Sequence, residues 1–380
     1  MDDPASPRGA HVHLYFSPWL HESRAWRAGR AALDCGLASS VEYIGHAQVS
    51  LPIAEERGPG ETVRRVGPPP ALPGAARLAR ALALPAWWRA TLRDMNSRSA
   101  ASLVVAHSLA SLPLGVMIKF RSGVKLLYDA HELESEREGW SWWMRKVARI
   151  AEATLIRFCD HTIVVNDSIG DWYRTTYPGL SVSTVRNVPT SLAHPGESTL
   201  RKDIGVDDAA VVVAYAGAFT RGRGLEMAVE AFSKVGGDKH LVMIGYGPMA
   251  ADLANLAGTS PNIHFRPPVE HNQVVPYLRG ADVGICLPNG ISLSYHFGLP
   301  NKLFEYAAAG LAVIVGQGPE FRAFANESGL GWSIANNVDS LVSTIGPLTR
   351  ASIKERVARS TYRPPIWDDE KQRLLAALRS

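Results

Sequence analysis

Residues 294–315 combine a cation, free backbone N–H groups and a carboxylate at a spacing that suits a phosphate-containing ligand. The run Ser294-Tyr-His-Phe-Gly-Leu-Pro-Asn-Lys-Leu-Phe-Glu-Tyr-Ala-Ala-Ala-Gly310 is followed by Leu-Ala-Val-Ile-Val315. Proline suits the first turn of a helix and glycine suits the position after its end. We therefore predict a glycine-proline loop, a short helix that begins at Pro300 or Asn301 and stops at Gly310, and then a buried strand.

The beginning of this helix is predicted to bind an anion. The residues Phe297, Gly298, Leu299, Pro300 and Asn301 lead into it, so unpaired backbone N–H groups would face the ligand with Lys302 beside them. Glu305 lies four residues after Asn301, on the same helix face, where its carboxylate could accept hydrogen bonds from sugar hydroxyls. A phosphate cradle beside a ribose-binding carboxylate is typical of a nucleotide-diphosphate site. A loop, helix and strand in this order also occur as plain packing, and that alternative stays open.

Further motifs recur along the chain in a recognisable order. They are Tyr128-Asp-Ala-His-Glu132, Ile163-Val-Val-Asn-Asp-Ser168, Arg186-Asn-Val-Pro189, Ala214-Tyr-Ala-Gly-Ala-Phe-Thr-Arg-Gly-Arg-Gly-Leu-Glu226 and Met243-Ile-Gly-Tyr-Gly-Pro248. Together with residues 294–315 they resemble the retaining GT-B glycosyltransferases of the nucleotide-sugar-dependent group 1 family. The similarity is to the branch that carries Leu-Pro-Asn-Lys-Leu-Phe-Glu-Tyr, and it extends from Ser17 to the C-terminus.

This resemblance implies roles for individual residues. Arg223 and Lys302 would hold the donor phosphates and stabilise the leaving group, and His131 would lie beside the transferred sugar. The rest of the donor site would comprise the loop residues already named with Glu305, and also Gly217, Arg221, Gly245, Tyr246 and Gly247. Weaker matches on the acceptor side are Glu132, Asn166 and Asn187, each of which has a structural alternative.

Two residues depart from the family pattern. Phe297 stands where a glutamate is usual eight residues before Glu305, which leaves the donor-sugar contacts open. Ala218 stands where an arginine often follows the glycine matched by Gly217, which leaves Arg221 as a replacement cation. The chain has no Asp-x-Asp pair to hold a metal-bound diphosphate, so we expect no divalent ion and no cofactor besides the nucleotide-sugar substrate.

Composition narrows the class of protein. The 380 residues suit two domains, and 46% hydrophobic and 20% charged residues are typical of soluble globular proteins. A net charge of +4 without basic blocks argues against a nucleic-acid partner. Three cysteines without a Cys-x-x-Cys pair indicate buried free thiols in a reducing compartment. No apolar run approaches the ~18 residues of a membrane span, and no signal-peptide pattern begins the chain, so a cytoplasmic location is expected.

The predicted elements give an α/β fold. Strand candidates are residues 11–16, 41–44, 103–106, 125–128, 162–165, 182–185, 211–216, 241–244, 263–265 and 283–287. Helix candidates are residues 23–33, 75–98, 142–158, 225–235, 249–257, 274–278 and 367–378. Residues 1–10 are expected to form a loose tail, residues 57–73 a loop or flexible arm, and residues 189–196 an interdomain linker. Regular strand–helix alternation predicts parallel sheets with ligands at the carboxyl ends of the strands.

The resemblance divides the chain into two Rossmann-like domains that face each other across a cleft. Residues 1–190 would bind the acceptor and residues 191–360 the nucleotide sugar. Residues 361–380 would form a helix that packs back on the first domain.

The N-terminal half is also rich in tryptophan next to basic residues. Trp87 and Trp88 lie among arginines, and Trp140, Trp142 and Trp143 precede Arg145 and Lys146. Such clusters suit a membrane interface, sugar stacking or core packing. The first alternative predicts a protein that is peripheral at the inner face of a membrane and acts on a lipid-linked acceptor.

We predict transfer of a sugar from a nucleotide-diphosphate sugar to an acceptor hydroxyl with retention at the anomeric carbon, the stereochemistry being implied by the resemblance. The pathway would be biosynthesis of a glycan, a cell-surface polysaccharide or a glycosylated natural product. Two alternatives stay open: a GT-B nucleotide-sugar epimerase, and a GT-B-like binding or scaffold protein without catalysis.

Overall fold

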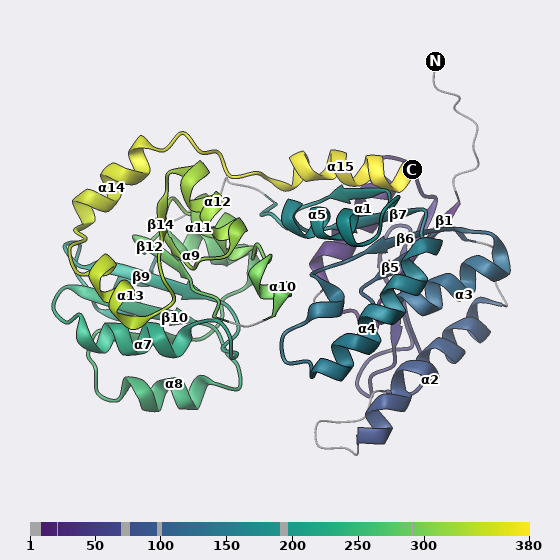
Figure 1. Ribbon diagram of the computed structural model, residues 1–380, viewed down its shortest axis with the longest axis horizontal. Helices are drawn as coiled ribbons and strands as arrows, with labels where there is room; N and C mark the ends of the chain where they lie inside the picture. The colour runs from purple at the N-terminus through teal and green to yellow at the C-terminus, as the bar shows by residue number, and fades with distance from the viewer. Residues whose placement is uncertain (1–8, 21, 70–76, 97–100, 191–196, 290–291) are drawn as a thin grey trace. The chain divides into compact units, whose positions relative to one another are not determined.

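The computed structural model describes residues 9–20, 22–69, 77–96, 101–190, 197–289 and 292–380 (Figure 1). The chain forms two compact units, one made of Met1–Arg186 with Glu370–Ser380 and the other of Asn187–Asp369. The predicted tail, apart from its last two residues, and residues 191–196 of the predicted linker lie outside the described residues.

The first unit is built on an eight-stranded sheet of order β3-β4-β2-β1-β5-β6-β7-β8. Its strands are β1 (Ala10–Leu14), β2 (Ser40–His46), β3 (Ala54–Gly58), β4 (Glu61–Val66), β5 (Ala101–His107), β6 (Lys125–Asp129), β7 (His161–Val164) and β8 (Val182–Thr184). Its helices are α1 (Ser23–Asp34), α2 (Arg77–Met95), α3 (Leu112–Ser122), α4 (Trp142–Leu155), α5 (Asp167–Thr176) and most of α15 (Trp367–Arg379). Neighbouring strands are parallel except β3 and β4.

The strand order places helices on both faces of this sheet. The connection from β1 to β2 runs one way across the sheet, and the connections from β5 through β6 to β7 run the other way. Because crossovers between parallel strands are right-handed, α1 covers one face, and α3 and α4 cover the opposite face. The carboxyl ends of β1, β5 and β6 therefore meet at one edge, which is where ligands bind in folds of this type.

The second unit is built on a six-stranded parallel sheet of order β11-β10-β9-β12-β13-β14. Its strands are β9 (Val211–Ala216), β10 (Lys239–Ile244), β11 (Ile263–Arg266), β12 (Val283–Cys286), β13 (Ala312–Val315) and β14 (Gly331–Ser333). Its helices are α6 (Leu200–Ile204), α7 (Leu225–Lys234), α8 (Ala250–Ala257), α9 (Val274–Leu278), α10 (Leu293–His296), α11 (Lys302–Ala308), α12 (Pro319–Ser328), α13 (Val338–Ile345) and α14 (Arg350–Arg359).

The buried strand β9 shows why this unit needs a continuous apolar run. All six residues from Val211 to Ala216 are buried. Val211, Val213 and Tyr215 belong to the core beneath α7, α8 and α13, whereas the intervening residues belong to the core beneath α9, α11 and α12 (Figure 1). Successive side chains of a strand point to opposite faces, so a strand covered on both sides must be apolar at every position.

The prediction of a loop at residues 57–73 is wrong for residues 57–66, because β3 and β4 form an antiparallel hairpin there. The strand pattern of β4 is hidden by Glu61 and Arg65, which point inward. Both are buried with partners: Tyr43 Oη donates to Glu61 at 2.7 Å, and Arg65 donates to the carbonyls of Pro18 at 2.7 Å and Pro52 at 2.9 Å. A charged side chain can occupy a core position when hydrogen bonds compensate its burial. A search for apolar residues alone does not identify such a position as buried.

Part of the predicted glycine-proline loop is also helical. Helix α10 (Leu293–His296) precedes Phe297, and the Ser292 hydroxyl caps it by accepting from the Tyr295 N–H at 3.2 Å. A four-residue helix is too short for a hydrophobic period to reveal.

Candidate active site

Two cations converge at the carboxyl end of β9 in the second unit. Lys302 Nζ lies 3.7 Å above the centre of the Tyr215 ring, and Arg223 Nη1 lies 3.4 Å from the Tyr215 hydroxyl. A Cβ built on Gly217 would lie 3.3 Å from Lys302 Nζ and 3.6 Å from Arg223 Nη1, so both cations lie within 3.6 Å of one point. Such a pair would hold one anion between them.

The glycine at this point is required by its backbone as well as by space. Gly217 has a backbone φ of +141°, a conformation that residues with a side chain rarely adopt. Its N–H donates to the Ile244 carbonyl at 2.9 Å. Burial works to lower the pKa of Arg223, but the hydroxyls of Tyr215 and Tyr295 outweigh it and raise that pKa above its ordinary value. The guanidinium therefore keeps its charge in a partly buried position.

Helix α11 brings the predicted phosphate-binding residues to the same place. The backbone N–H groups of Leu299, Asn301 and Lys302 have no acceptor among the described residues. The helix has seven residues, so its dipole adds little to the two side-chain cations. Glu305 lies in its first turn, half-buried, one turn beyond Lys302.

A buried tyrosine that the sequence reading did not single out holds α11 against the sheet. The Tyr306 hydroxyl donates to the Ile285 carbonyl at 3.2 Å and accepts from the Ala216 N–H at 3.1 Å. A side chain at Gly284 would collide with the Tyr306 ring. This ring therefore joins α11 to β9 and β12 and sets where Lys302 and Gly217 meet.

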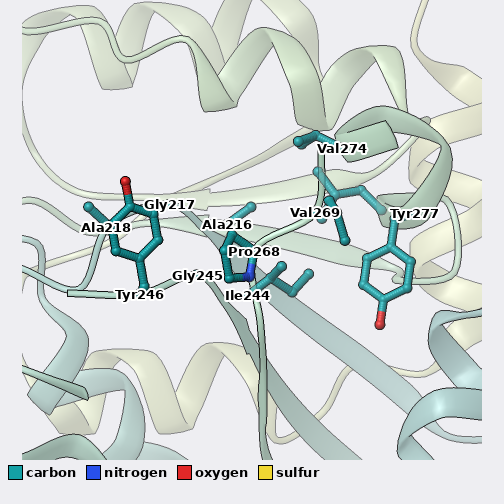
Figure 2. A pocket seen from close by; sticks show the side chains of 11 residues that line it. Ala216, Gly217, Ala218, Ile244, Gly245, Tyr246, Pro268, Val269, Val274 and Tyr277 are labelled. Carbon is teal, nitrogen blue, oxygen red and sulfur yellow. The ribbon is translucent and has the colours of Figure 1, made fainter. Parts of the chain in front are cut away.

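An apolar pocket of about 180 Å³ includes Gly217 in its lining (Figure 2). Gly217 is also the point at which the two cations converge. The pocket is lined by Ala216, Gly217, Ala218, Ile244, Gly245, Tyr246, Pro268, Val269, Val274, Tyr277 and Leu278. Gly217, Gly245 and Tyr246 were predicted to belong to the donor site, whereas the lining after β11 was not. The ring of Tyr246, 68% exposed, lies with Ala218 at one side of this pocket (Figure 2). Side chains on Gly245 or Gly247 would collide with backbone atoms of Gly217 and Phe219, respectively.

The remaining donor-site predictions are more exposed. Arg221 is exposed on the loop after β9. Phe297 follows α10 and packs edge-on against His296 with ring centres 5.0 Å apart. Gly298 and Pro300 complete the turn into α11.

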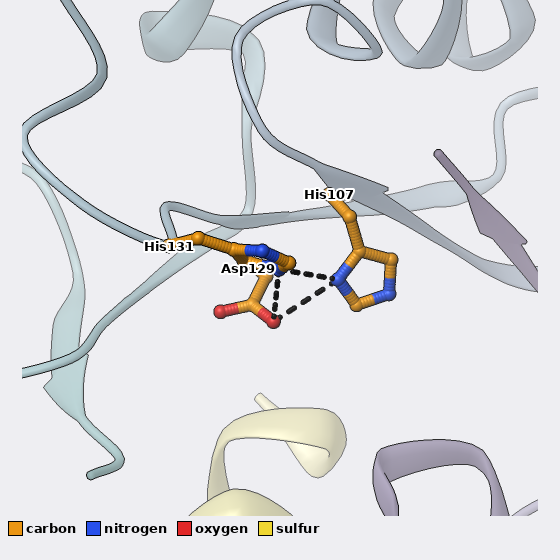
Figure 3. A group of neighbouring side chains, drawn as sticks. All are labelled: His107, Asp129 and His131. Carbon is orange, nitrogen blue, oxygen red and sulfur yellow. Dashed lines mark hydrogen bonds and ion pairs between the residues drawn. The ribbon is translucent and has the colours of Figure 1, made fainter. Parts of the chain in front are cut away.

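The first unit carries a cluster of histidines around a buried carboxylate (Figure 3). His107 Nδ1 lies 3.1 Å from Asp129 Oδ2 and 3.1 Å from His131 Nε2, and the other nitrogen of His107 lies 2.9 Å from His13 Nδ1. Burial lowers the pKa of His107 and of His13. Both rings therefore favour the neutral form at pH 7. His107 alone of the two contacts His131, which is only partly buried.

Arg24 neutralises the carboxylate of this cluster. Its guanidinium donates to both oxygens of Asp129 at 2.8 to 3.1 Å. Burial alone would raise the pKa of Asp129, but Arg24 and the two histidines outweigh it and hold this pKa well below its ordinary value. The signal in the sequence was that His107 and Asp129 each end a strand at the carboxyl edge of the sheet.

His107, Asp129 and His131 are also a group that could hold a metal ion, since their ligand atoms lie within 4.8 Å of one another. An Asp-x-Asp pattern does not describe this group, because two of its members are histidines and His107 ends β5, whereas Asp129 and His131 lie at the end of β6 and just after it. The Arg24 guanidinium already pairs with the Asp129 carboxylate, so a divalent ion bound there would lie next to a charge of the same sign. This geometry fits a hydrogen-bonded cluster better than a metal centre.

The acceptor-side candidates have structural partners. Glu132 pairs with Arg137 at 2.8 Å, and the buried Asn166 caps α5 by accepting from the Ile169 N–H at 2.8 Å. The neighbouring Glu134 accepts from the His131 N–H at 3.3 Å, which fixes the backbone beside that histidine. Asn187 is the first residue of the second unit.

Comparison with known proteins agrees with this architecture. Residues 43–189 match Glycosyltransferase Family 4, and residues 210–350 match Glycosyl transferases group 1. The alpha-maltose-1-phosphate synthase of Mycolicibacterium smegmatis is 28% identical over 179 residues, which cover 43% of this chain and 46% of that enzyme. The match thus spans less than half the length of that relative.

Solved structures share the fold over almost the whole chain. A sucrose-phosphate synthase from Thermosynechococcus elongatus is 16% identical, with a TM-score of 0.75 over 98% of this chain and 95% of that one. Anabaena HepE, solved with UDP and glucose, is 14% identical, with a TM-score of 0.70 over 98% and 99%. Two parallel-sheet units with these neighbours make up a GT-B fold, and the matched segments show that the chain belongs to the group 1 (family 4) glycosyltransferases.

Proposed function

We propose that this protein transfers a sugar from a nucleotide-diphosphate sugar to an acceptor hydroxyl. The observation that carries the proposal is the convergence of Arg223 and Lys302 within 3.6 Å of one point, beside an apolar pocket. A diphosphate fits the cations, and the adjoining pocket has the apolar lining and size that suit a nucleobase. Glu305 would accept hydrogen bonds from the ribose hydroxyls.

The chemistry follows from where negative charge grows. As the glycosidic bond breaks, charge accumulates on the leaving phosphate, and two fixed cations at that place stabilise the transition state more than the substrate. We propose that the acceptor hydroxyl attacks from the face that the phosphate leaves, so that the configuration is retained and the phosphate takes the proton. No protein nucleophile and no divalent ion enter this scheme, and His131 would contact the transferred sugar.

The acceptor and the location are part of the same proposal. The acceptor would be a lipid-linked hydroxyl compound at the inner face of a membrane. The tryptophan-rich, basic surface of the first unit would contact that membrane, and the second unit would bind the nucleotide sugar. A cytoplasmic enzyme of glycan, polysaccharide or natural-product biosynthesis would meet both substrates there.

The first experiment is a thermal-shift screen of the intact chain against UDP-, GDP-, ADP- and TDP-sugars. A ligand at ~100 times its Kd stabilises the folded state by about 2.7 kcal/mol, which is readily measured. The stabilising donor is then incubated with and without candidate acceptors, and the products are analysed. Transfer requires the acceptor, an epimerase changes the sugar without one, and a binding protein turns over nothing. Stabilisation by none of the four donors would refute the assignment of the site.

A further inference from the structure

Helix α4 in the first unit exposes an unusual number of large apolar side chains. The exposed fractions are 77% for Trp142, 56% for Trp143, 59% for Val147 and 60% for Ile150. Residues 143, 147 and 150 recur at the spacing of one helix face. Soluble proteins rarely leave such a stripe in water unless it contacts a partner or a membrane.

The opposite face of α4 is firmly anchored. Ala148 and Glu152 are buried and lie about 140–180° around the helix from Trp143. The Glu152 carboxylate accepts from the hydroxyls of Tyr128 at 2.9 Å and Tyr173 at 2.5 Å. The helix thus packs on the unit with its other side, and the exposed stripe is not a core face that has lost its neighbour.

Basic residues accompany this apolar stripe. Residues 142–158 contain Arg145, Lys146, Arg149 and Arg157 and one acid, Glu152, which is buried. Lys146 has no ion-pair partner in the described part of the chain, and Arg149 pairs with Glu136. Tryptophan beside cations on one side of a helix is the composition that enters the interface of an anionic bilayer.

The tryptophans of α2 do not belong to an exposed apolar surface of this kind. Trp87 is fully buried and packs against Phe16 with ring centres 5.4 Å apart, and Trp88 donates to the Ala110 carbonyl at 3.0 Å. Of the three alternatives left open for the tryptophans, core packing is therefore the one that holds for Trp87. Among the described residues, no helix is both long and apolar enough to cross a bilayer. Any contact of this helix with lipid would be peripheral.

We propose that α4 docks the first unit on an anionic lipid surface, with Trp142, Trp143, Val147 and Ile150 in the interface and Lys146 at the headgroups. The loop that carries His131 connects β6 to this helix, and the Arg149–Glu136 pair ties the two together. Docking would hold His131 near a membrane-borne acceptor. The docking proposal deepens the proposed function. Only its statement about the acceptor rests on that function, because lipid binding is measured without turnover.

The test is flotation of the intact chain with neutral phosphatidylcholine vesicles and with vesicles that also contain phosphatidylglycerol. We expect binding to the anionic vesicles alone, weakened by salt because the attraction is screened. The variant with Trp143→Ser and Ile150→Ser should lose at least tenfold in partition coefficient, and Lys146→Gln about fivefold. All three side chains are exposed, so the variants should keep the wild-type melting temperature. Leu256→Ser, on an exposed site of α8, is the matched control and should bind as the wild type.

Three results would overturn the docking proposal. The wild type could fail to float with anionic vesicles. The variant with Trp143→Ser and Ile150→Ser, here called the stripe variant, could bind as well as the wild type. The stripe variant could also convert a wild-type dimer to a monomer in sedimentation velocity, which would identify a second copy as the occupant. Vesicle binding without glycosyl transfer would contradict the proposed function alone, and transfer to a soluble acceptor without vesicle binding would contradict docking alone.

Discussion

Neutral substitution of Arg223 or Lys302 should remove much of the affinity for a nucleoside diphosphate. The two cations lie within 3.6 Å of one point at Gly217, so an anion there would contact both. A hydrogen bond to a charged group contributes about 1.5–3 kcal/mol, which corresponds to a loss of about 10- to 150-fold in Kd for each substitution. Turnover should fall by roughly 10²-fold in kcat/KM, the scale of removed electrostatic contacts to a developing charge.

The two substitutions should also be coupled. Independent sites add within about 0.3–0.5 kcal/mol, whereas residues that share one ligand group depart further from additivity. Arg223→Ala, Lys302→Ala and the double variant therefore form a cycle that tests whether one anion bridges both side chains. Calorimetric titration with the free nucleoside diphosphate of the preferred donor measures each corner of the cycle without knowledge of the acceptor.

A matched control separates this effect from the loss of any surface cation. Lys234 on α7 is half-exposed and pairs with Glu230 at 2.9 Å in the same unit, so Lys234→Ala should leave the nucleotide Kd unchanged. Surface substitutions of that kind cost within about 0.5 kcal/mol of stability. Affinities of both single variants within twofold of the wild type would refute the reasoning, because the convergence at Gly217 would then have no ligand.

Three further outcomes are expected. Glu305→Gln should weaken nucleotide binding at least tenfold with little change in melting temperature, because a charged acceptor of ribose hydroxyls becomes neutral; an unchanged Kd by calorimetry would make Glu305 structural. Transfer should survive EDTA, since Arg24 already neutralises Asp129 in the histidine cluster; activity lost in EDTA and restored by magnesium or manganese would contradict this. Burial raises the pKa of Glu152 from 4.5 to about 7, so its contribution to stability is full below pH 4.5 and is lost as pH rises towards 7, by about 3 kcal/mol. Glu152→Gln should remove this decline in calorimetric scans between pH 4.5 and 7.5, and parallel profiles would disprove the assignment.

The sequence alone determined the elements that rely on local patterns. β9 coincides with the predicted residues 211–216, and α7 (Leu225–Lys234) matches the predicted residues 225–235 to within one residue. A buried parallel strand is a continuous apolar run, and a helix of this length has its own period. The order of motifs also indicated the GT-B fold and placed Gly217, Arg223 and Lys302 in one unit, where the structure brings them together.

Tertiary structure alone decided which polar and aromatic residues are buried. Arg65 and Glu61 occupy inward positions of β4 because carbonyls and a tyrosine from other segments satisfy them, and no local pattern encodes those partners. The same limit separates Trp87, which fills the core, from Trp142, which is 77% exposed, although both stand beside basic residues in the sequence.

The histidine cluster shows the same dependence on distant contacts. His13, His107 and Asp129 end up together because β1, β5 and β6 are neighbours in the sheet, and strand order is set by pairing across about a hundred residues of chain. A sequence reveals the type of each element from its nearest neighbours. Which side chains meet at a sheet edge depends on how those elements pair, so His131 was predicted on its motif while the groups that orient it were not.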